Sequence, residues 1–313
     1  MLSELSLIPS PPEGFKSGFV AIIGRPNVGK STLMNKLVGQ KVAITSPVAQ
    51  TTRNRLRGIL TTPEAQIIFV DTPGIHKPHH QLGKVLVQNA QNAIKSVDLT
   101  LFLVDSAVEA GGGDRFITDF VSKTKAPTIL GLNKSDQQPQ NDSNIPVLDS
   151  SYQKLAQPAG WPTAKFSALT GDGLDELLSL LVSKLPKGPY YYPPDLVTDQ
   201  PERFIMGELI REQILHFTRE EVPHSVAVGI DRVDESPEIT RVLATIYVER
   251  QSQKGIAIGK KGQMLKAIGT AAREQMQKLI DGKVYLEIFV KVQPKWRQSR
   301  NLLADFGYRV EKD

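Results

Sequence analysis

The sequence predicts an α/β domain with a mostly parallel sheet, followed by a smaller α+β domain. Residues 18–185 alternate short apolar runs with longer amphipathic segments, which is the pattern of repeated βα units. Residues 186–201 are rich in proline and have no regular period, as expected for a linker. The pattern then changes, and the 313-residue chain is long enough for about two domains. We therefore expect the second domain over residues 202–313.

Composition excludes several classes of protein. Cysteine is absent, so neither a disulfide framework nor a thiolate zinc site can form. No run approaches the roughly 18 apolar residues of a membrane-spanning helix. Residues 1–17 contain prolines and no continuous apolar core, so we expect a disordered tail and not a signal peptide. These features together predict a cytoplasmic protein.

Positive charge is concentrated in the last fifth of the chain. The formal net charge of the whole protein is +5. Residues 250–313 contain fourteen Lys or Arg against six Asp or Glu, a net charge of +8 for this segment alone. We therefore expect an anionic partner at the second domain.

The expected strands of the first domain are the apolar runs "GFVAIIG", "IIFVDTPG", "LTLFLVD", "PTILGLNKSD" and "AKFSAL". Each is followed by a longer amphipathic or polar segment. Ligands of parallel α/β sheets bind beyond the carboxyl ends of the strands. The loops that follow these runs are therefore the place to look for chemistry.

The first of these loops, "GRPNVGKS", fits the pattern G-x-x-x-x-G-K-[ST] between a strand and a helix. Glycines at both ends let backbone N–H groups surround phosphate oxygens at a helix N-terminus. Lys30 is expected to reach the β and γ phosphates, and Ser31 to bind magnesium. The predicted phosphate-binding residues are Gly24, Arg25, Pro26, Asn27, Val28, Gly29, Lys30, Ser31, Thr32 and, from the next loop, Gly74.

Two further loops extend this prediction. The motif "DTPG" ends a strand, which places Asp71 near the magnesium ion and the Gly74 N–H near the γ-phosphate. The motif "NKSD" ends another strand: Asp136 can accept from two guanine N–H groups, Asn133 can pair with the other edge of the purine, and Lys134 can cover the ring. Adenine lacks that pair of donors, so GTP is favoured over ATP. The last strand is followed by Ser167 and Ala168, whose loop offers the Ala168 N–H to the guanine oxygen.

With these motifs in order, the first domain resembles the Ras-like GTPases. The resemblance implies a P-loop GTPase fold, a GTP/GDP cofactor and a Mg²⁺ ion held by Ser31, Thr52 and Asp71, with Thr51 as the alternative to Thr52. Switch I is expected at Gln50, Thr51, Thr52 and Arg53. Switch II is expected at Asp71, Thr72, Pro73, Gly74 and Ile75.

Many relatives have a glutamine after D-x-x-G that orients the attacking water, whereas this sequence has Ile75. Another group or a partner must then assist hydrolysis, and we expect slow intrinsic turnover. An N-V-G-K loop combined with an apolar residue at this position resembles the TrmE-Era branch of the superfamily. The resemblance implies that Asn27 holds a potassium ion, which we take as a hypothesis.

The second domain contains another glycine and lysine loop, formed by Gly259, Lys260, Lys261 and Gly262. It joins two helices of an expected α-β-β-α-α-β unit in the most basic part of the chain. This arrangement resembles a type II KH domain, whose loop binds the backbone of about four single-stranded nucleotides. Ile256, Ile258 and Leu265 either contact the bases or belong to the core.

The roles of three arginines and one tryptophan are left with alternatives. Arg53, Arg55 and Arg57 alternate along "TTRNRLRG". We expect them on a solvated strand face, with contact to RNA or a role in hydrolysis as the alternatives. Trp296 either stacks on a base or is a surface aromatic that closes the last strand.

Together the two halves resemble the ribosome-assembly GTPases of the TrmE-Era branch. This resemblance implies a switch that binds the 3′ region of 16S ribosomal RNA and assists 30S subunit assembly, with RNA captured in the GTP state and no DNA partner. It also allows peripheral contact with the inner membrane. Two alternatives remain: a GTPase acting on a protein or tRNA-modification partner, with the basic domain as a docking module, and an RNA-binding protein whose nucleotide site hardly turns over.

Overall fold

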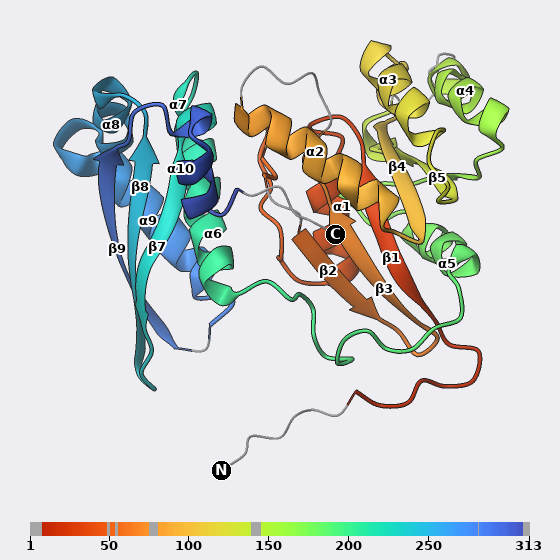
Figure 1. Cartoon of the computed structure of the whole chain (residues 1–313), viewed down its shortest axis with the longest axis horizontal. Helices are drawn as coiled ribbons and strands as arrows, with labels where there is room; N and C mark the ends of the chain where they lie inside the picture. The colour runs from red at the N-terminus through yellow and green to blue at the C-terminus, as the bar shows by residue number, and fades with distance from the viewer. Residues whose placement is uncertain are drawn as a thin grey trace.

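The computed structural model describes residues 8–48, 51–53, 56–74, 81–138, 145–280 and 282–308, with backbone only for 145–147. The chain forms two domains that lie side by side (Figure 1). Within the described residues, no helix is long and apolar enough to cross a membrane. The predicted combination of a mostly parallel α/β domain and a KH-type α+β domain is confirmed.

The first domain is a six-stranded sheet in the order β2-β3-β1-β4-β5-β6. All neighbouring strands are parallel except β2, which pairs antiparallel with β3 at one edge. Its elements are β1 (Lys16–Ile23), α1 (Lys30–Val38), β2 (Leu56–Thr61), β3 (Ala65–Asp71), α2 (Gln81–Lys95), β4 (Leu99–Asp105), α3 (Gly112–Val121), β5 (Thr128–Asn133), η1 (Ser135–Gln137), α4 (Ile145–Ala156), η2 (Gln157–Ala159), β6 (Thr163–Lys165) and α5 (Leu174–Lys184). The five predicted strands are present, and β2 is an additional one.

Both faces of this sheet are covered by helices because the central strands are apolar on both sides. In β1, Val20 and Ile22 pack into one core with α1 and α5. Ala21 and Ile23 point to the opposite face and pack with α2, α3 and α4. This double burial fixes the carboxyl ends of β1, β3 and β5 at one edge, where the predicted motifs lie.

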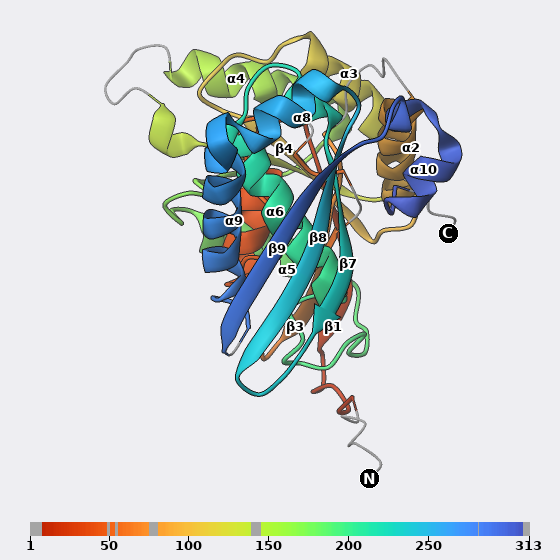
Figure 2. The ribbon, with the colours of Figure 1, turned by 90° about the vertical axis from the view of Figure 1, so that its left-hand side faces the viewer.

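The second domain follows the predicted α-β-β-α-α-β order, with four short helices added. Its elements are α6 (Glu202–Phe217), α7 (Val222–Ser225), β7 (Ala227–Asp234), β8 (Ile239–Val248), α8 (Gln251–Ile258), η3 (Lys260–Gly262), α9 (Gln263–Met276), β9 (Lys283–Val292), η4 (Trp296–Gln298) and α10 (Arg300–Asp305). The sheet order is β7-β8-β9, antiparallel and then parallel. Helices α6 and α9 pack on one face, and the other face is turned toward the viewer in Figure 2.

The predicted linker packs along the first domain over most of its length. The Tyr191 N–H donates to the Gln66 side chain at 2.7 Å, and Tyr190 packs against Phe15 with ring centroids 4.4 Å apart. The Ile59 N–H donates to the Val197 carbonyl at 2.8 Å, which attaches the linker to β2. Phe15 is buried, and β1 begins at Lys16, two residues before the predicted start of the domain.

The two domains share a buried cluster at the N-terminal end of α2. Leu82 and Leu86 from α2 pack with Trp296, Leu303 and Tyr308 from the C-terminal segment. Trp296 is fully buried, and its Nε1–H donates to the Ser225 carbonyl at 2.9 Å. Both predicted positions for Trp296, a stacking surface and a surface aromatic, are therefore wrong: the indole is part of the interdomain core.

Candidate nucleotide site and RNA groove

The phosphate loop occupies the turn between β1 and α1. Gly29 caps α1 with a left-handed backbone, φ 100° and ψ 21°, so the first amides of the helix face the mouth of the loop. Lys30 is buried, and its ammonium donates to the carbonyls of Gly24 at 3.2 Å and Arg25 at 2.9 Å. Burial lowers the pKa of Lys30 to about 8, although Asp71 opposes the shift. A phosphate beside this ammonium would restore its charged form.

Residues from the phosphate loop, the DTPG motif and the NKSD motif surround one cavity of about 290 Å³. Its lining residues are Pro26, Asn27, Gly29, Lys30, Ser31, Thr32, Ile44, Thr45, Ser46, Pro47, Thr51, Thr52, Gly74 and Lys134. Most of the predicted phosphate-binding residues are thus brought together. The segment Ile44 to Pro47 was not predicted as part of the site.

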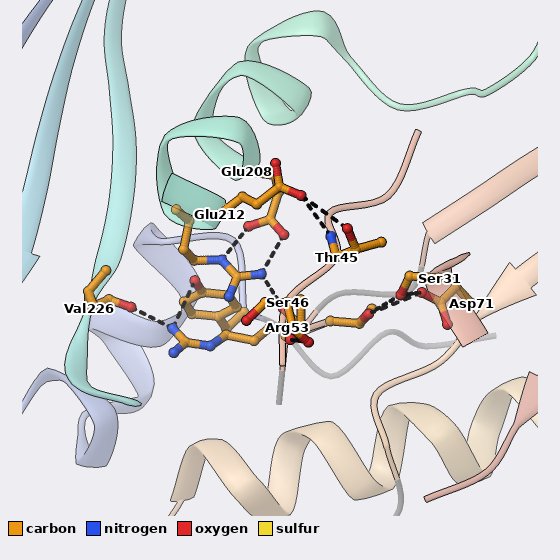
Figure 3. Close-up of polar contacts among 12 residues, drawn as sticks. Ser31, Thr45, Ser46, Arg53, Asp71, Glu208, Glu212 and Val226 are labelled. Carbon is orange, nitrogen blue, oxygen red and sulfur yellow. Dashed lines mark hydrogen bonds and ion pairs between the residues drawn. The ribbon is translucent and has the colours of Figure 1, made fainter. Parts of the chain in front are cut away.

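Three oxygens of the predicted magnesium set meet at the edge of this cavity. Ser31 Oγ and Thr52 Oγ1 donate to Asp71 Oδ2 at 2.6 and 3.0 Å, and the two hydroxyls lie 2.9 Å apart (Figure 3). Asp71 is fully buried, which raises its pKa, while Lys30 acts in the opposite direction. A carboxylate with two hydroxyls is a donor set that fits Mg²⁺. Thr51, the alternative, instead donates to the Val48 carbonyl at 2.6 Å.

Asn27 connects the phosphate loop to the segment before switch I. It has a positive φ of 64°, and its amide Nδ2 donates to the Pro47 carbonyl at 2.8 Å. Two predicted switch residues, Gln50 and Ile75, lie outside the described residues. Of the rest of switch II, Asp71 and Thr72 are buried, and Thr72 Oγ1 donates to the Ile22 carbonyl at 2.9 Å.

The predicted guanine loops are joined by Asn133. Its Nδ2 donates to the Val28 carbonyl at 2.8 Å, and its Oδ1 accepts the Ala168 N–H at 2.8 Å. Asn133 therefore connects the phosphate loop to the loop after β6. The sequence predicts that this side chain faces the purine. The Ala168 N–H, expected at the guanine oxygen, points to the same amide. Ser167, next to it, is buried, and its Oγ accepts the Thr170 N–H at 3.1 Å.

The other two residues of this motif remain at the surface. Lys134 pairs with Asp105 at 2.6 Å, which holds its stem over the site. Asp136 is exposed in η1 and has no hydrogen bond or ion pair within the described residues. Its carboxylate is thus in a position to accept from a guanine base.

Arg53 is not on a solvated strand face, so that expectation is wrong. Its side chain is 2% exposed and donates to carbonyls of the second domain. Arg57 is partly buried and pairs with Asp199 of the linker at 2.6 Å. Arg55 lies outside the described residues.

The second glycine loop lies at the surface between α8 and α9. Gly259 and Gly262 have positive φ values of 73° and 77°, and Lys260 and Lys261 are exposed. Beside the loop runs a groove of about 560 Å³ between α9 and β9, lined by Gly262, Leu265, Lys266, Gly269, Thr270, Arg273, Tyr285, Leu286 and Ile288. The groove therefore continues from the loop along one face of α9.

The predicted apolar contacts of this groove are only partly found. Leu265 lines it, whereas Ile258 packs against the domain core and Ile256 is exposed on α8 outside the groove lining. Lys266 and Arg273 were not predicted as site residues. Their spacing from Gly262, four and eleven residues along a helix, would have placed them on the loop side of α9.

Comparisons with known proteins agree with this two-part geometry. A family model described as 50S ribosome-binding GTPase matches residues 19–134, and a model described as KH domain matches residues 221–297. The chain is 73% identical over 308 residues to GTPase Era of Rippkaea orientalis, covering 98% of this chain and 97% of the relative. It is 73% identical over 309 residues to GTPase Era of a Nostoc species, covering 99% and 94%.

Solved structures give the same result. A variant of Aquifex aeolicus Era bound to GDP·AlF4⁻ superposes with a TM-score of 0.90 at 40% identity, over 94% of this chain and 99% of that one. Era in complex with MgGDPNP and nucleotides 1506–1542 of 16S ribosomal RNA superposes with a TM-score of 0.89 at 40% identity, with the same coverage.

Proposed function

Because this chain belongs to the Era family of GTPases, we propose that it is a magnesium-dependent switch that binds the 3′ region of 16S ribosomal RNA and assists 30S assembly. The observation that supports the proposal most is the presence of both sites on one chain. A phosphate loop with a converging Ser, Thr and Asp lies in one domain, and a basic G-x-x-G loop beside a groove lies in the other.

In the first domain, Ser31, Thr52 and Asp71 would hold Mg²⁺, which screens the charge of the β and γ phosphates. Lys30 and the amides at the start of α1 supply further positive potential at the same oxygens. Asp136 would select guanine by accepting its two N–H groups. The amide of Asn27 and the Pro47 carbonyl, which lie in contact, would supply oxygens to a potassium ion once the amide turns.

In the second domain, Lys260 and Lys261 would meet successive phosphates of single-stranded RNA and release counterions. Lys266 and Arg273 extend the positive charge along the groove. A solved Era complex with nucleotides 1506–1542 of 16S ribosomal RNA supports this choice of RNA. Binding in the GTP state is expected to be tighter than in the GDP state.

The test is the affinity of the protein for an RNA that copies nucleotides 1506–1542, measured with GDP and with a non-hydrolysable GTP analogue. A scrambled RNA is the sequence control. We expect the double variant Lys260→Asp, Lys261→Asp to bind the RNA at least about tenfold more weakly. The slope of log affinity against log salt concentration should become shallower by the amount that about two lost phosphate contacts contribute.

The double variant Lys123→Asp, Lys125→Asp is the matched control, because it makes the same charge change at exposed lysines of the first domain. Unchanged RNA binding in the Lys260 and Lys261 variant would exclude the G-x-x-G loop as the RNA site. Equal binding of all RNAs in both nucleotide states would leave a GTPase with a basic docking module.

A further inference from the structure

Three consecutive residues of switch I have partners in three different places. The Thr51 carbonyl accepts from Arg211 of α6, Thr52 Oγ1 donates to Asp71, and Arg53 donates to the segment around α7 (Figure 3). The predicted magnesium ligand therefore lies between two residues that are attached to the second domain.

Arg53 is attached by its guanidinium. Nη1 donates to the Val226 carbonyl at 2.5 Å and Nη2 to the Pro223 carbonyl at 3.1 Å. The guanidinium carbon lies 5.8 Å from the ring centroid of Tyr308, a cation–π distance. Only 2% of the Arg53 surface is exposed, so the guanidinium is desolvated and contacts backbone carbonyls and one aromatic ring in place of water. Burying a charge in this way is unfavourable unless its hydrogen bonds are made with good geometry.

The segment before Thr52 is attached by α6. Arg211 is fully buried and is oriented by Glu208, whose oxygens accept at 2.7 and 2.6 Å. The next residue of α6, Glu212, accepts the Thr45 N–H at 2.9 Å and pairs with Lys41 at 2.5 Å. Helix α6 thus holds the segment before switch I at Thr45 and switch I itself at Thr51, while Arg53 holds the chain after the magnesium position.

We propose that Arg53 is a positioning residue of the GTPase reaction, through which the KH domain holds Thr52 at the magnesium site. With its two neighbours fixed, Thr52 Oγ1 stays within 3.0 Å of Asp71 and 2.9 Å of Ser31. The segment then loses little further conformational freedom when the ion and the γ-phosphate bind. The proposal rests on the GTPase activity and on the assignment of Thr52 to magnesium, and it does not depend on the identity of the RNA.

The test is the Mg²⁺ dependence of nucleotide binding by the full chain carrying Arg53→Ala. We expect Mg²⁺ to bind at least about tenfold more weakly in the presence of a non-hydrolysable GTP analogue, the size of effect that partners of metal ligands have. Affinity for GDP should stay within about threefold, since the partners of Arg53 among the described residues lie in the second domain and not in the phosphate loop or the guanine loops. An intact GDP site also shows that the variant is folded.

A double-mutant cycle with Thr52→Ala separates positioning from a general structural effect. If Arg53 acts through Thr52, replacing Arg53 in the Thr52→Ala background should not weaken Mg²⁺ binding further. Arg53→Lys, which keeps the charge but has no planar fork to reach two carbonyls, should fall between wild type and Arg53→Ala.

Arg57→Ala is the matched control. It removes an arginine from the same stretch of chain. The partner of Arg57 is Asp199, which lies in the linker and not in the KH domain. Its Mg²⁺ affinity should equal that of wild type. The proposal is overturned if Arg53→Ala keeps wild-type Mg²⁺ affinity with the GTP analogue, or if it weakens Mg²⁺ equally in the Thr52→Ala background.

Discussion

The substitution Gly29→Ala should break the connection that Asn133 makes between the phosphate loop and the guanine loops. Gly29 caps the N-terminus of α1 at φ 100°, and a Cβ built there would lie 2.3 Å from Asn133 Nδ2. Asn133 is 2% exposed, so its amide has no room to swing aside. It must move by about 1 Å to reach an ordinary contact, and a hydrogen bond does not survive such a shift.

The free-energy cost of Gly29→Ala has two contributions. A side chain forced into the left-handed region costs roughly 1–2 kcal/mol. Displacing Asn133 leaves the Val28 carbonyl and the Ala168 N–H without their partner, and a buried unsatisfied group costs about 1–3 kcal/mol. The second contribution alone is therefore at least about 2 kcal/mol. The free variant avoids this cost by letting the two loops move apart, whereas a bound nucleotide holds them together, so the cost falls on binding and corresponds to a loss of guanine-nucleotide affinity of up to about 30-fold.

Gly39→Ala is the control because Gly39 caps the other end of the same helix at φ 78°, with nothing within 4 Å of an added Cβ. Both variants share the backbone strain, and only Gly29→Ala displaces Asn133. Titration with a fluorescent GDP analogue measures affinity, and denaturant unfolding measures stability. The reasoning is refuted if the two variants bind GDP equally, or if Gly29→Ala stays within about threefold of wild type.

Three further predictions concern other parts of the molecule. Asp136→Asn should weaken GTP binding by about a hundredfold or more, since an amide cannot accept both guanine N–H groups; competition against a xanthine nucleotide, whose carbonyl can accept from the new amide, measures the change in preference. Trp296→Ala should lower the free energy of unfolding by about 3–5 kcal/mol, and Trp296→Phe by less, as measured by denaturant titration. Replacing K⁺ with Na⁺ should lower the rate of GTP hydrolysis about tenfold if a cation at Asn27 stabilises transition-state charge, and an unchanged turnover number would exclude that ion.

The nucleotide motifs could be predicted because their chemistry depends on short local segments. A strand, a glycine turn and a helix in direct succession place Lys30 and Ser31 without help from the rest of the chain. The same holds for Gly259 to Gly262, which needs only a helix on either side. In both cases the residues that form the loop also provide its function.

The interdomain contacts could not be predicted, because nothing in a local pattern states what a side chain meets 150 residues away. Arginines at alternate positions of a polar segment are usually solvated, yet Arg53 is buried against carbonyls near residue 225. Trp296 beside two basic residues has the composition of a nucleic-acid contact, yet it packs on α2. Within the first domain, the two hydrogen bonds from Asn133 to backbone groups of neighbouring loops were likewise not predicted, while its contact with the base stays a prediction.

The interface places the KH domain against both predicted switch regions at once. Arg53 and Arg211 attach it to switch I, and Trp296 with Tyr308 attaches it to α2, the helix that follows switch II. A rotation of the KH domain would have to break buried charged hydrogen bonds on one side and separate an aromatic cluster on the other. Intermediate arrangements would leave both unsatisfied, which favours a small number of discrete domain positions. By linkage, if the ligands of the two domains each prefer one of these positions, each ligand changes the affinity for the other by the same factor.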